Sequence, residues 1–385
     1  MRTGEHVMKK WIWQQPDWTQ FSWNETIIVP KTRQLHLKIG MLLGHDAESI
    51  QKQKLTLDAL VNNLISSSAI EGEALNVNSI RSSLARHLNI PIENEASVTI
   101  QTELMAKILI DALENTERPL TFERLIQWHQ WLFADPQNLP LYKIRIGELR
   151  GDEPMQVVSG RWNAPKVHFQ VPDRLGLEGR LEQFVQWFNQ SLDNVLLDPF
   201  IRAGIAHFWF VTLHPFDDGN GRITRMITDL ALAQMDKQSI RLYAMSSTIL
   251  KRRSSYYEIL EQSQKGTSDI TEWLNWFLET LEQSLDETLD KIQRTLFKAQ
   301  FWKKYDAYNL SEAQIKVLNR LLDGGERGFL QGINASQYQK VAKVSKATAT
   351  RHLTYLLQMG CLVKMDGGGR NTRYQVNLSL SILDA

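Results

Sequence analysis

Cysteine is almost absent from this sequence, because the 385 residues contain a single one, Cys361. One thiol excludes an internal disulfide framework and a zinc site built on cysteines. Long apolar runs are also missing: no stretch approaches the roughly 18–20 residues that a helix needs to cross a bilayer. The first residues, MRTGEHVMKKW, have no apolar segment of the kind found in signal peptides. We therefore expect a cytoplasmic protein without disulfides and without a membrane partner.

Surplus charge of either sign is equally absent. The chain contains 44 Lys and Arg against 43 Asp and Glu, which leaves a formal net charge of +1. The charge of the whole chain gives no indication of a nucleic-acid partner, although it is compatible with a local basic patch. Hydrophobic residues make up 43% of the sequence, an ordinary share for a globular protein. The length is enough for two or three domains.

The hydrophobic pattern is mostly helical, which predicts a mainly α fold. Apolar residues recur at near 3.6-residue spacing between about Arg33 and Ser68 and in many later segments. The segment 141–172 instead predicts a β-hairpin, because two β-type runs flank a break rich in Gly, Asn and Pro. Further helices are predicted at 97–115, 121–133, 176–191, 198–213, after 221, within 250–300, and at 311–322, 336–341 and 345–359.

Four tryptophans lie close together near the N-terminus. Large amphipathic rings in so short a stretch predict an ordered arm that packs on a domain. These residues are Trp11, Trp13, Trp18 and Trp23. We divide the chain into an N-terminal arm and helical region, a central domain and a C-terminal domain, with bounds of 1–95, 96–300 and 308–385.

The segment HPFDDGNGRITR, residues 214–225, has the features of a phosphate-binding turn. An apolar, helix-compatible run precedes it, and Pro215 ends that helix. The residues at 219–221 can adopt positive φ, so that consecutive backbone N–H groups point into one concavity. Arg222 and Arg225 are three positions apart and share a face of the helix that begins there. A glycine-rich turn at a helix N-terminus, backed by two arginines, is suited to phosphate groups.

Two further residues of this segment carry chemistry. Asp218 lies at the mouth of the turn, where a carboxylate can hold Mg²⁺ against phosphates. His214 lies just before the turn, where an imidazole can accept a proton from an attacking hydroxyl. Each feature alone is common in proteins, and it is their combination within twelve residues that indicates a site.

The segment resembles the Fic family pattern, His-Pro-Phe-x-Asp/Glu-Gly-Asn-Gly-Arg-x-x-Arg, at every fixed position. Fic proteins are mostly helical and typically transfer AMP from ATP to Ser, Thr or Tyr hydroxyls of a target protein. The resemblance implies a Fic helical core in this chain, with ATP as substrate and Mg²⁺ as cofactor. By position it implies a general base at His214, a metal ligand at Asp218, α- and β-phosphate contacts from Gly219, Asn220, Gly221 and Arg222, and a γ-phosphate contact from Arg225.

The predicted hairpin at 155–171 takes the place of the flap of Fic proteins, which holds an extended segment of the target by strand addition. The resemblance implies that four flap residues face the nucleotide, and an ordinary surface hairpin is the alternative. These residues are Val157, Val158, Ser159 and Gly160.

The segment around Tyr256 and Tyr257 resembles the family segment that helps to form the adenine pocket. By this resemblance one of the two tyrosines stacks on the base, with Gln264 nearby. Two core tyrosines are an equally good interpretation.

A short segment, SSSAIEGE, resembles the inhibitory motif Ser/Thr-x-x-x-Glu-Gly/Asn of Fic proteins, with Ser67, Glu71 and Gly72 at the fixed positions. Ser67 and Glu71 are four apart and share a helix face. A carboxylate beside Arg225 would pair with its guanidinium and occupy the γ-phosphate subsite. The position ahead of the core implies the subclass with an N-terminal inhibitory helix.

Residues 311–377 resemble a winged helix-turn-helix, with 345–357 as the candidate recognition helix. We expect three of its leucines to pack inward and its basic and hydroxyl residues to face outward. DNA binding and pure protein contact, including dimerisation, both fit this module. The inward residues are Leu353, Leu356 and Leu357; the outward ones are Lys346, Thr348, Thr350 and Arg351; Gly367–Gly369, Arg370 and Arg373 form the predicted wing.

These patterns support two functions of different class. The first is an autoinhibited protein adenylyltransferase, a homodimer by analogy with similar proteins, whose substrate is another protein or itself. Removal of AMP by the same site, with Glu71 orienting water, is a variant of it, as is transfer of another nucleotide or phosphate group. The second is a DNA-binding regulator whose Fic domain senses a nucleotide. The intact His214 and Asp218 argue against a domain that has lost its catalysis.

Overall fold

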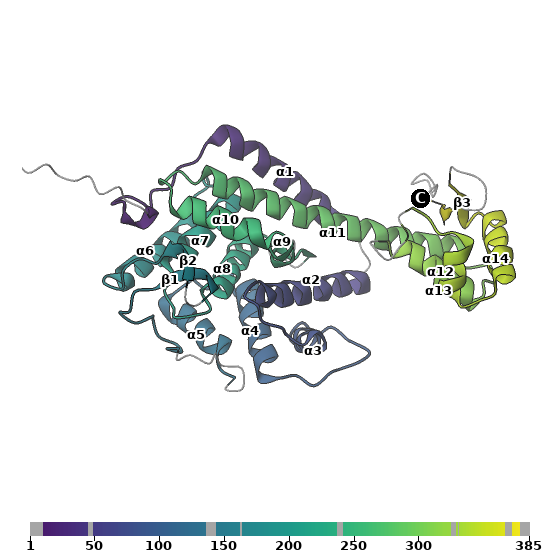
Figure 1. The fold of residues 1–385 in the computed structure, drawn as a ribbon, viewed down its shortest axis with the longest axis horizontal. Coiled ribbons are helices and arrows are strands. Elements are labelled where there is room, and N and C mark those ends of the chain that lie inside the picture. The colour runs from purple at the N-terminus through teal and green to yellow at the C-terminus, as the bar shows by residue number, and fades with distance from the viewer. Residues whose placement is uncertain are drawn as a thin grey trace, which may run out of the picture. The chain divides into compact units, whose positions relative to one another are not determined.

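The computed structural model describes residues 11–44, 49–135, 144–161, 164–236, 242–324, 329, 331–365 and 372–377. The chain forms two compact units, Met1–Thr288 and Leu289–Ala385. The described residues are mainly helical with two small hairpins, which confirms the predicted fold class (Figure 1). The helices and strands of unit 1 are α1 (Glu25–Gly44), α2 (Ser49–Ile70), α3 (Val77–His87), α4 (Ile100–Glu114), α5 (Phe122–Leu132), β1 (Gln156–Arg161), β2 (Ala164–Gln170), α6 (Leu177–Gln190), α7 (Pro199–Leu213), α8 (Asn220–Met235), α9 (Met245–Lys251), α10 (Arg253–Gln264) and α11 (Thr271–Tyr305), which ends in unit 2.

The centre of unit 1 is a pair of buried helices, α7 and α8. Every residue of α7 from Phe200 to Leu213 is buried, as expected of a helix that is apolar on all sides. Asp198 caps this helix by accepting a hydrogen bond from the Phe200 N–H, and Pro199 occupies the first helical position. Helices α4, α5 and α2 pack against α8, so the turn between α7 and α8 is surrounded by other elements.

The tryptophan arm packs on unit 1, as predicted. The Trp11 ring lies edge-on to Phe169 of β2, with ring centroids 5.5 Å apart. The Trp13 indole N–H donates to the Gln170 carbonyl over 2.7 Å. Trp18 contacts Trp209 of α7 at 6.1 Å between centroids. The arm therefore fixes the second strand of the hairpin to the helical core.

Two helices differ from the sequence prediction. Helix α1 begins at Glu25 instead of near Arg33, and Pro30 lies inside it in the second turn. Helix α3 was not predicted, because serines take half of its buried positions and only Ile80, Leu84 and Ala85 are apolar there. Ser79 Oγ lies 2.7 Å from Thr102 Oγ1, and Ser83 Oγ donates to Glu103 over 2.6 Å. Hydrogen bonds to α4 thus replace apolar contacts on this face.

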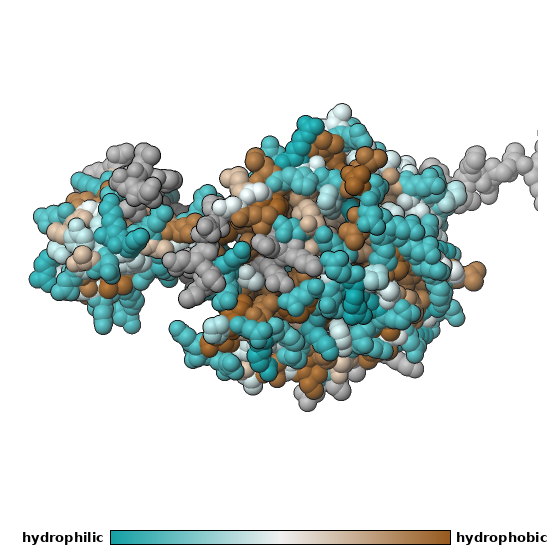
Figure 2. Space-filling view, turned by 180° about the vertical axis from the view of Figure 1, so that it is seen from behind, coloured by the Kyte–Doolittle hydropathy of each residue, from teal (hydrophilic) through white to brown (hydrophobic). Residues whose placement is uncertain are grey.

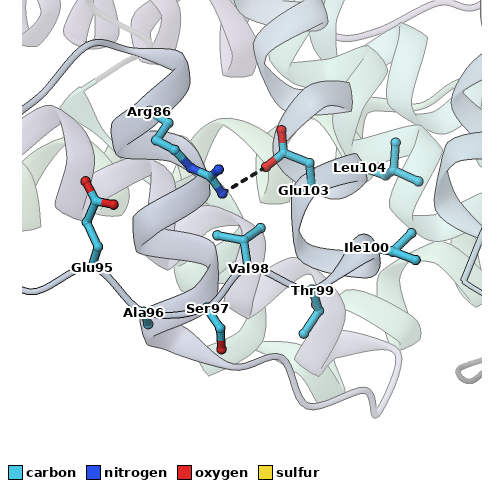
Figure 3. A pocket seen from close by; sticks show the side chains of 9 residues that line it. All are labelled: Arg86, Glu95, Ala96, Ser97, Val98, Thr99, Ile100, Glu103 and Leu104. Carbon is cyan, nitrogen blue, oxygen red and sulfur yellow. Dashed lines mark ion pairs between the residues drawn. The ribbon is translucent and has the colours of Figure 1, made fainter.

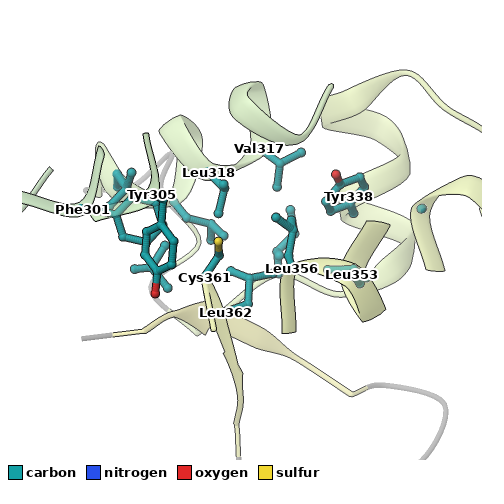
Figure 4. Close-up of a cluster of buried hydrophobic side chains, with 14 residues drawn as sticks. Phe301, Tyr305, Val317, Leu318, Tyr338, Leu353, Leu356, Cys361 and Leu362 are labelled. Carbon is teal, nitrogen blue, oxygen red and sulfur yellow. The ribbon is translucent and has the colours of Figure 1, made fainter. Parts of the chain in front are cut away.

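The described residues of unit 2 form the end of α11, three further helices and a small sheet around an apolar core (Figure 4). Its elements after α11 are α12 (Glu312–Leu322), α13 (Ala335–Ala342), α14 (Lys346–Gln358), β3 (Leu362–Lys364) and β4 (Tyr374–Val376). The strands pair antiparallel, and Ile333 bridges to Tyr374 of β4. The core is filled by Phe301, Tyr305, Val317, Leu318, Leu321, Leu322, Ile333, Tyr338, Ala349, Leu353, Leu356, Cys361, Leu362 and Val376.

The predicted inward face of α14 needs one correction. Leu353 and Leu356 are buried, but Leu357 is 38% exposed and Ala349 takes the third inward position. The helical period explains this, because 349, 353 and 356 follow one stripe and 357 lies beyond its edge. Lys346, Thr350 and Arg351 are exposed and Thr348 is half-buried. Gly367–Gly369 and Arg370 of the predicted wing lie outside the described residues.

The surface is mixed in character. Figure 2 shows hydrophilic residues over much of the face that it draws, with smaller hydrophobic areas between them. None of the helices in the described part of the chain is both long and apolar enough to span a membrane.

Candidate active site

His214 follows the last residue of α7 and has a left-handed backbone, with φ 49° and ψ 58°. A non-glycine residue in this region costs about 1 kcal/mol, so neighbouring contacts must hold it. Arg150 supplies them: its Nε donates to the His214 carbonyl and its backbone N–H to the Pro215 carbonyl, both over 2.9 Å. The same guanidinium donates to the Pro172 carbonyl after β2. Buried Arg150 thus ties the turn after α7 to the end of the hairpin.

The imidazole of His214 is arranged to accept a proton. Its Nδ1 lies 3.1 Å from the Val211 carbonyl, which can only accept, so Nδ1 carries the hydrogen and Nε2 keeps its lone pair. Burial lowers the pKa of His214, and the charge of Arg150 adds to this effect, whereas Glu71 and Asp218 oppose it. A lowered pKa keeps the ring neutral at pH 7, which is the state that a general base needs.

The loop between His214 and α8 differs from the prediction in one respect. Among residues 219–221, Gly219 alone has positive φ, at 78°, whereas Asn220 and Gly221 form the first turn of α8. The Asn220 side chain closes the loop on itself: it accepts from the Phe216 N–H over 3.0 Å and donates to the Phe216 carbonyl over 2.8 Å. A ligand can therefore meet the backbone of Asn220 but not its side chain, while the helix N-terminus remains suited to an anion.

Arg222 and Arg225 are both buried in α8, with exposed fractions of 4% and 2%. Arg225 donates from Nε to Ser67 Oγ and from Nη2 to the Ser67 carbonyl and to Glu71 Oε1, all over 2.8 Å. Arg222 Nη1 donates to both carboxylate oxygens of Glu73 over 2.5 and 2.6 Å. Arg225 Nη1 and Arg222 Nε are buried without a hydrogen-bond partner among the described residues. Buried donors of this kind are expected where a ligand completes the site.

The end of α2 lies over the start of α8. Ser67 is fully buried, and Glu71 and Gly72 follow the last helical residue. A Cβ atom added to Gly221 would collide with Glu71 Oε1, so the carboxylate lies directly on the first turn of α8. The contact between Glu71 and Arg225 that the sequence led us to expect is present in the structure. Glu73 was not expected, and the signal that could have indicated it is its position two residues after Glu71.

Asp218 and His129 form a second layer around the loop. Gly219 N–H donates to Asp218 Oδ1 over 2.5 Å, and Arg222 Nη2 lies 3.8 Å from the same oxygen. His129 Nδ1 accepts from the Gly147 N–H over 3.0 Å, so its Nε2 carries the hydrogen that faces the Asp218 carbonyl at 3.3 Å. Burial lowers the pKa of His129 to about 4.

His129 also supports Phe216 by stacking, with ring centroids 4.2 Å apart and planes 14° from parallel. Nothing in the spacing of the motif indicated this residue, because it comes from α5, far from 214–225 in the sequence. Arg145 holds Asp217, with its backbone N–H donating to the carboxylate over 2.9 Å. The loop is therefore fixed from three sides before any ligand binds.

The hairpin divides its residues between the core and the surface. Val157 pairs with Phe169 and packs in the cluster of Trp11, Phe169 and Val171, so it faces the arm. After a register shift, Val158 pairs with Val167 and is 50% exposed. Ser159 and Gly160 continue β1 opposite Lys166 and Pro165. Of the two valines, Val158 is therefore the one whose side chain is open to a ligand.

The residues predicted to bind the base also divide between the core and the surface. Tyr256 is 2% exposed, its hydroxyl lies 2.9 Å from His207 Nε2, and burial raises its pKa. Gln264 is also buried and donates to Thr212 over 3.1 Å. Both side chains are buried, which favours the core interpretation that the sequence left open for Tyr256. Tyr257 is 36% exposed, and its hydroxyl donates to the carbonyl of Ile70 over 3.4 Å.

A surface hollow of about 680 Å³ lies elsewhere, on α3, α4 and the segment that precedes α4 (Figure 3). The ion pair of Arg86 and Glu103, 3.7 Å apart, lies among its lining residues. None of the residues that the sequence predicted for the site lines this hollow. At the α7–α8 turn, the carboxylates of Glu71 and Glu73 occupy the positions that face the arginines.

Comparisons with known proteins agree with this geometry. Residues 119–232 match the model of the Fic/DOC family, and residues 11–90 match a domain of unknown function, DUF4172. The first match contains the loop and both arginines, and the second contains Ser67, Glu71 and Gly72.

Curated relatives include a protein adenylyltransferase Fic of Nematostella vectensis, 21% identical over 74% of this chain, and protein adenylyltransferase fic-1 of Caenorhabditis elegans, 25% identical over 51%. The aligned regions span 64% and 35% of those two relatives. The solved structure of Fic-1 from C. elegans superposes with a TM-score of 0.50 at 19% identity, covering 70% of this chain and 74% of that one. With the motif, the helical core and the family match in agreement, residues 119–232 of this chain are a Fic/DOC family domain.

Proposed function

We propose that this chain is an autoinhibited protein adenylyltransferase, which transfers AMP from ATP to a hydroxyl group of a protein. One observation carries the proposal: two buried arginines at the N-terminus of α8 are held by carboxylates beside a neutral histidine. Buried guanidinium groups that are neutralised by flexible acidic side chains can exchange them for phosphate groups. The names of the curated relatives support the same activity.

The residues present fit a nucleoside triphosphate. Arg222 Nε and Arg225 Nη1 are buried donors that no described residue satisfies, and they add to the N–H groups of the first turn of α8. In this proposal Arg222 and the backbone of Gly219–Gly221 bind the α- and β-phosphates, and Arg225 binds the γ-phosphate. Tyr257, expected at the base, and Val158, expected to face the nucleotide from the flap, have side chains that are open to a ligand, with exposed fractions of 36% and 50%.

The chemistry of Asp218 fits a magnesium ion that is shared with phosphates. Its carboxylate is partly exposed, and the described residues contain no cluster of three or more His, Cys, Asp or Glu that could hold a metal ion by themselves. Mg²⁺ often binds through one carboxylate, substrate phosphates and water. When bound, it would neutralise phosphate charge as the leaving group departs.

The proposed reaction uses groups of this chain in a simple order. The oxygen of a target hydroxyl attacks the α-phosphorus of ATP, the bond from that phosphorus to the β-phosphate oxygen breaks, and pyrophosphate leaves. Nε2 of His214 takes the hydroxyl proton. Arg222 and Arg225 offset the charge that develops on the phosphates. The hairpin, fixed by the arm and by Arg150, is the surface on which the target segment binds.

Inhibition follows from the position of Glu71. Its carboxylate lies on the first turn of α8 and pairs with Arg225, which the γ-phosphate needs. Ser67 strengthens the pair by accepting from Arg225 Nε and by offering its own carbonyl to Nη2. In this state ATP either stays out or binds with misaligned phosphates.

Label transfer from α-³²P-ATP with Mg²⁺ tests the proposal. The wild type, Glu71→Gly and Glu71→Gly/His214→Ala are compared, each alone and with cell lysate. We expect label on protein with Glu71→Gly, little with the wild type and none with the double variant. Equal labelling by the wild type and Glu71→Gly would remove the inhibitory role. No label in any sample would favour removal of AMP or nucleotide sensing.

Unit 2 supports a second function, which we propose as an accessory one. Three helices followed by a pair of antiparallel strands support a winged helix, and Lys346 and Arg351 of α14 are exposed. Exposed cations on such a helix suit DNA phosphates. If this surface binds DNA, Lys346→Ala/Arg351→Ala should weaken binding and reduce its salt dependence. Unchanged binding would favour the alternative, in which unit 2 serves protein contacts such as dimerisation.

A further inference from the structure

The turn that follows α2 carries two carboxylates, and each meets a different arginine of α8. Glu71 pairs with Arg225 over 2.8 Å, and Glu73 pairs with Arg222 over 2.5 Å. The two glutamates are two positions apart, and the two arginines are three positions apart on one helix face. Glu71 belongs to the inhibitory motif that begins at Ser67, whereas Glu73 lies just outside it.

The backbone of the turn explains how both side chains reach one helix. The Glu73 N–H donates to the Ser68 carbonyl over 3.0 Å and the Gly72 N–H to the Ala69 carbonyl over 3.1 Å. These are the two hydrogen bonds of a Schellman motif, with Gly72 in the left-handed conformation at φ 86°. The chain therefore reverses its direction at Gly72, between the two glutamates. Both carboxylates reach α8 because of this turn.

The ion pair of Glu73, like that of Glu71, is made with a buried arginine. Arg222 is 4% exposed, donates from Nη1 to both oxygens of Glu73, and has its guanidinium 5.1 Å from the centre of the Phe133 ring. Phosphates that reach the first turn of α8 must compete with this carboxylate for Arg222. Since Glu73 keeps 36% of its side chain exposed, water can solvate it when it is displaced.

We propose that Glu73 is a second inhibitory residue, which occupies the α- and β-phosphate arginine while Glu71 occupies the γ-phosphate arginine. This inference rests on the proposed function for the naming of the subsites. It implies that entering phosphates displace both carboxylates from the arginines in one event, because a single turn carries both glutamates. Release of the turn, by a partner or by the nucleotide itself, frees both arginines together.

Binding of ATP with Mg²⁺, measured by calorimetry on the full chain, tests the inference without any transfer. We expect Glu73→Gln to tighten binding roughly tenfold, because it removes the charge that competes with phosphate for Arg222 and weakens a charge-assisted hydrogen bond. The matched control is Glu287→Gln, which removes an ion pair with Lys251 from a side chain of similar exposure, 40%. A dissociation constant for Glu73→Gln equal to that of the control would overturn the inference.

Substitutions at Gly72 test the shared turn while both carboxylates remain. An added methyl group meets no atom within 4 Å, so Gly72→Ala acts through the strained positive φ alone. We expect Gly72→Ala to tighten ATP binding roughly fivefold, and Gly72→Asn, which tolerates this conformation, to stay close to the wild type. Unchanged ATP binding with Gly72→Ala would contradict the proposal that this turn releases both glutamates together.

The two proposals fail in different ways. If Glu71→Gly transfers no AMP but Glu73→Gln still tightens binding of ATP, the double inhibition stands and the transferase proposal fails. If Glu71→Gly transfers AMP and Glu73→Gln matches its control, Glu73 has no part in inhibition and the transferase proposal stands.

Discussion

The two units of the chain bury different kinds of side chain. Unit 1 buries the charged guanidinium groups of Arg150, Arg222 and Arg225, among others, at the α7–α8 turn. In unit 2 the described residues bury no charged side chain, and its core is apolar apart from Gln314 and aromatic hydroxyl groups. Buried charge is expensive unless it is paired, so it persists where a function requires it. The contrast agrees with the proposal that the chemistry takes place in the interior of unit 1.

The largest effect should come from the histidine at the turn of unit 1. His214→Ala in the Glu71→Gly background removes the proton acceptor, and a positioned general base contributes roughly 10²–10⁴-fold to the rate. We expect a loss of that size in the rate of label transfer, with the affinity for ATP unchanged. An active double variant would show that another group accepts the proton.

The matching test in unit 2 is a substitution in its apolar core, where no charged side chain is involved. Leu356 is fully buried, so Leu356→Ala should destabilise unit 2 by about 2–5 kcal/mol, as cavity-forming substitutions do. Denaturant unfolding measures the loss. ATP binding by the Glu71→Gly protein should stay unchanged when this substitution is added. Weaker ATP binding would mean that the site depends on unit 2.

A smaller effect should come from a buried carboxyl that links α2 to α8. Asp229 accepts from Asn63 of α2 over 2.8 Å, and burial raises its pKa to about 7. Because the ordinary value is 3.8, the folded protein holds this proton between about pH 4 and 7 while the unfolded chain does not. Wild-type stability should therefore fall through that window as pH rises, by about 1 kcal/mol per pH unit from this group.

Asp229→Asn removes the titration and keeps an acceptor for Asn63. The difference in unfolding free energy between the wild type and this variant should shift in favour of the variant from pH 5 to pH 7. Above pH 7 it should become constant. Parallel stability profiles of the two proteins over this range would mean that Asp229 is charged in the folded state.

The smallest effect should be a change in pH dependence through Arg150. Its charge helps to lower the pKa of His214, so Arg150→Gln should raise that pKa and move the acid limb of transfer to higher pH. Arg150→Lys keeps the charge and serves as the control, with its acid limb close to that of the parent. The rate against pH is measured in the Glu71→Gly background. Identical limbs for Arg150→Gln and Arg150→Lys would argue against this electrostatic role.

Those parts of the site that are contiguous in the chain could be predicted from the sequence. His214, Asp218, Gly219 and the two arginines stand within twelve residues, and a local pattern can show such a turn. Glu71 was expected beside Arg225 because a second short motif indicated it, and the structure contains that contact. The mainly helical fold also followed from apolar periodicity.

The parts that were missed depend on contacts between distant segments. His129 comes from α5, Arg150 from the segment before the hairpin, and neither has a neighbour in sequence that marks it. Helix α3 was missed because half of its buried residues are serines. Glu73 was missed because its partner Arg222 was assigned to phosphates alone. Tyr256 and Gln264 were expected near the base from a resemblance of their segment, with a core position as the alternative, and a local resemblance cannot show which of the two tyrosines is buried.

The most direct test of the central claim compares two labels on the same nucleotide. The Glu71→Gly protein is incubated with Mg²⁺ and ATP that carries ³²P either at the α- or at the γ-phosphate, with and without lysate, and protein-bound label is measured. Transfer of AMP predicts label on protein from α-labelled ATP and none from γ-labelled ATP. Label from γ-labelled ATP alone would identify transfer of a phosphate group, and it would contradict the proposed roles of His214, Arg222 and Arg225 in AMP transfer.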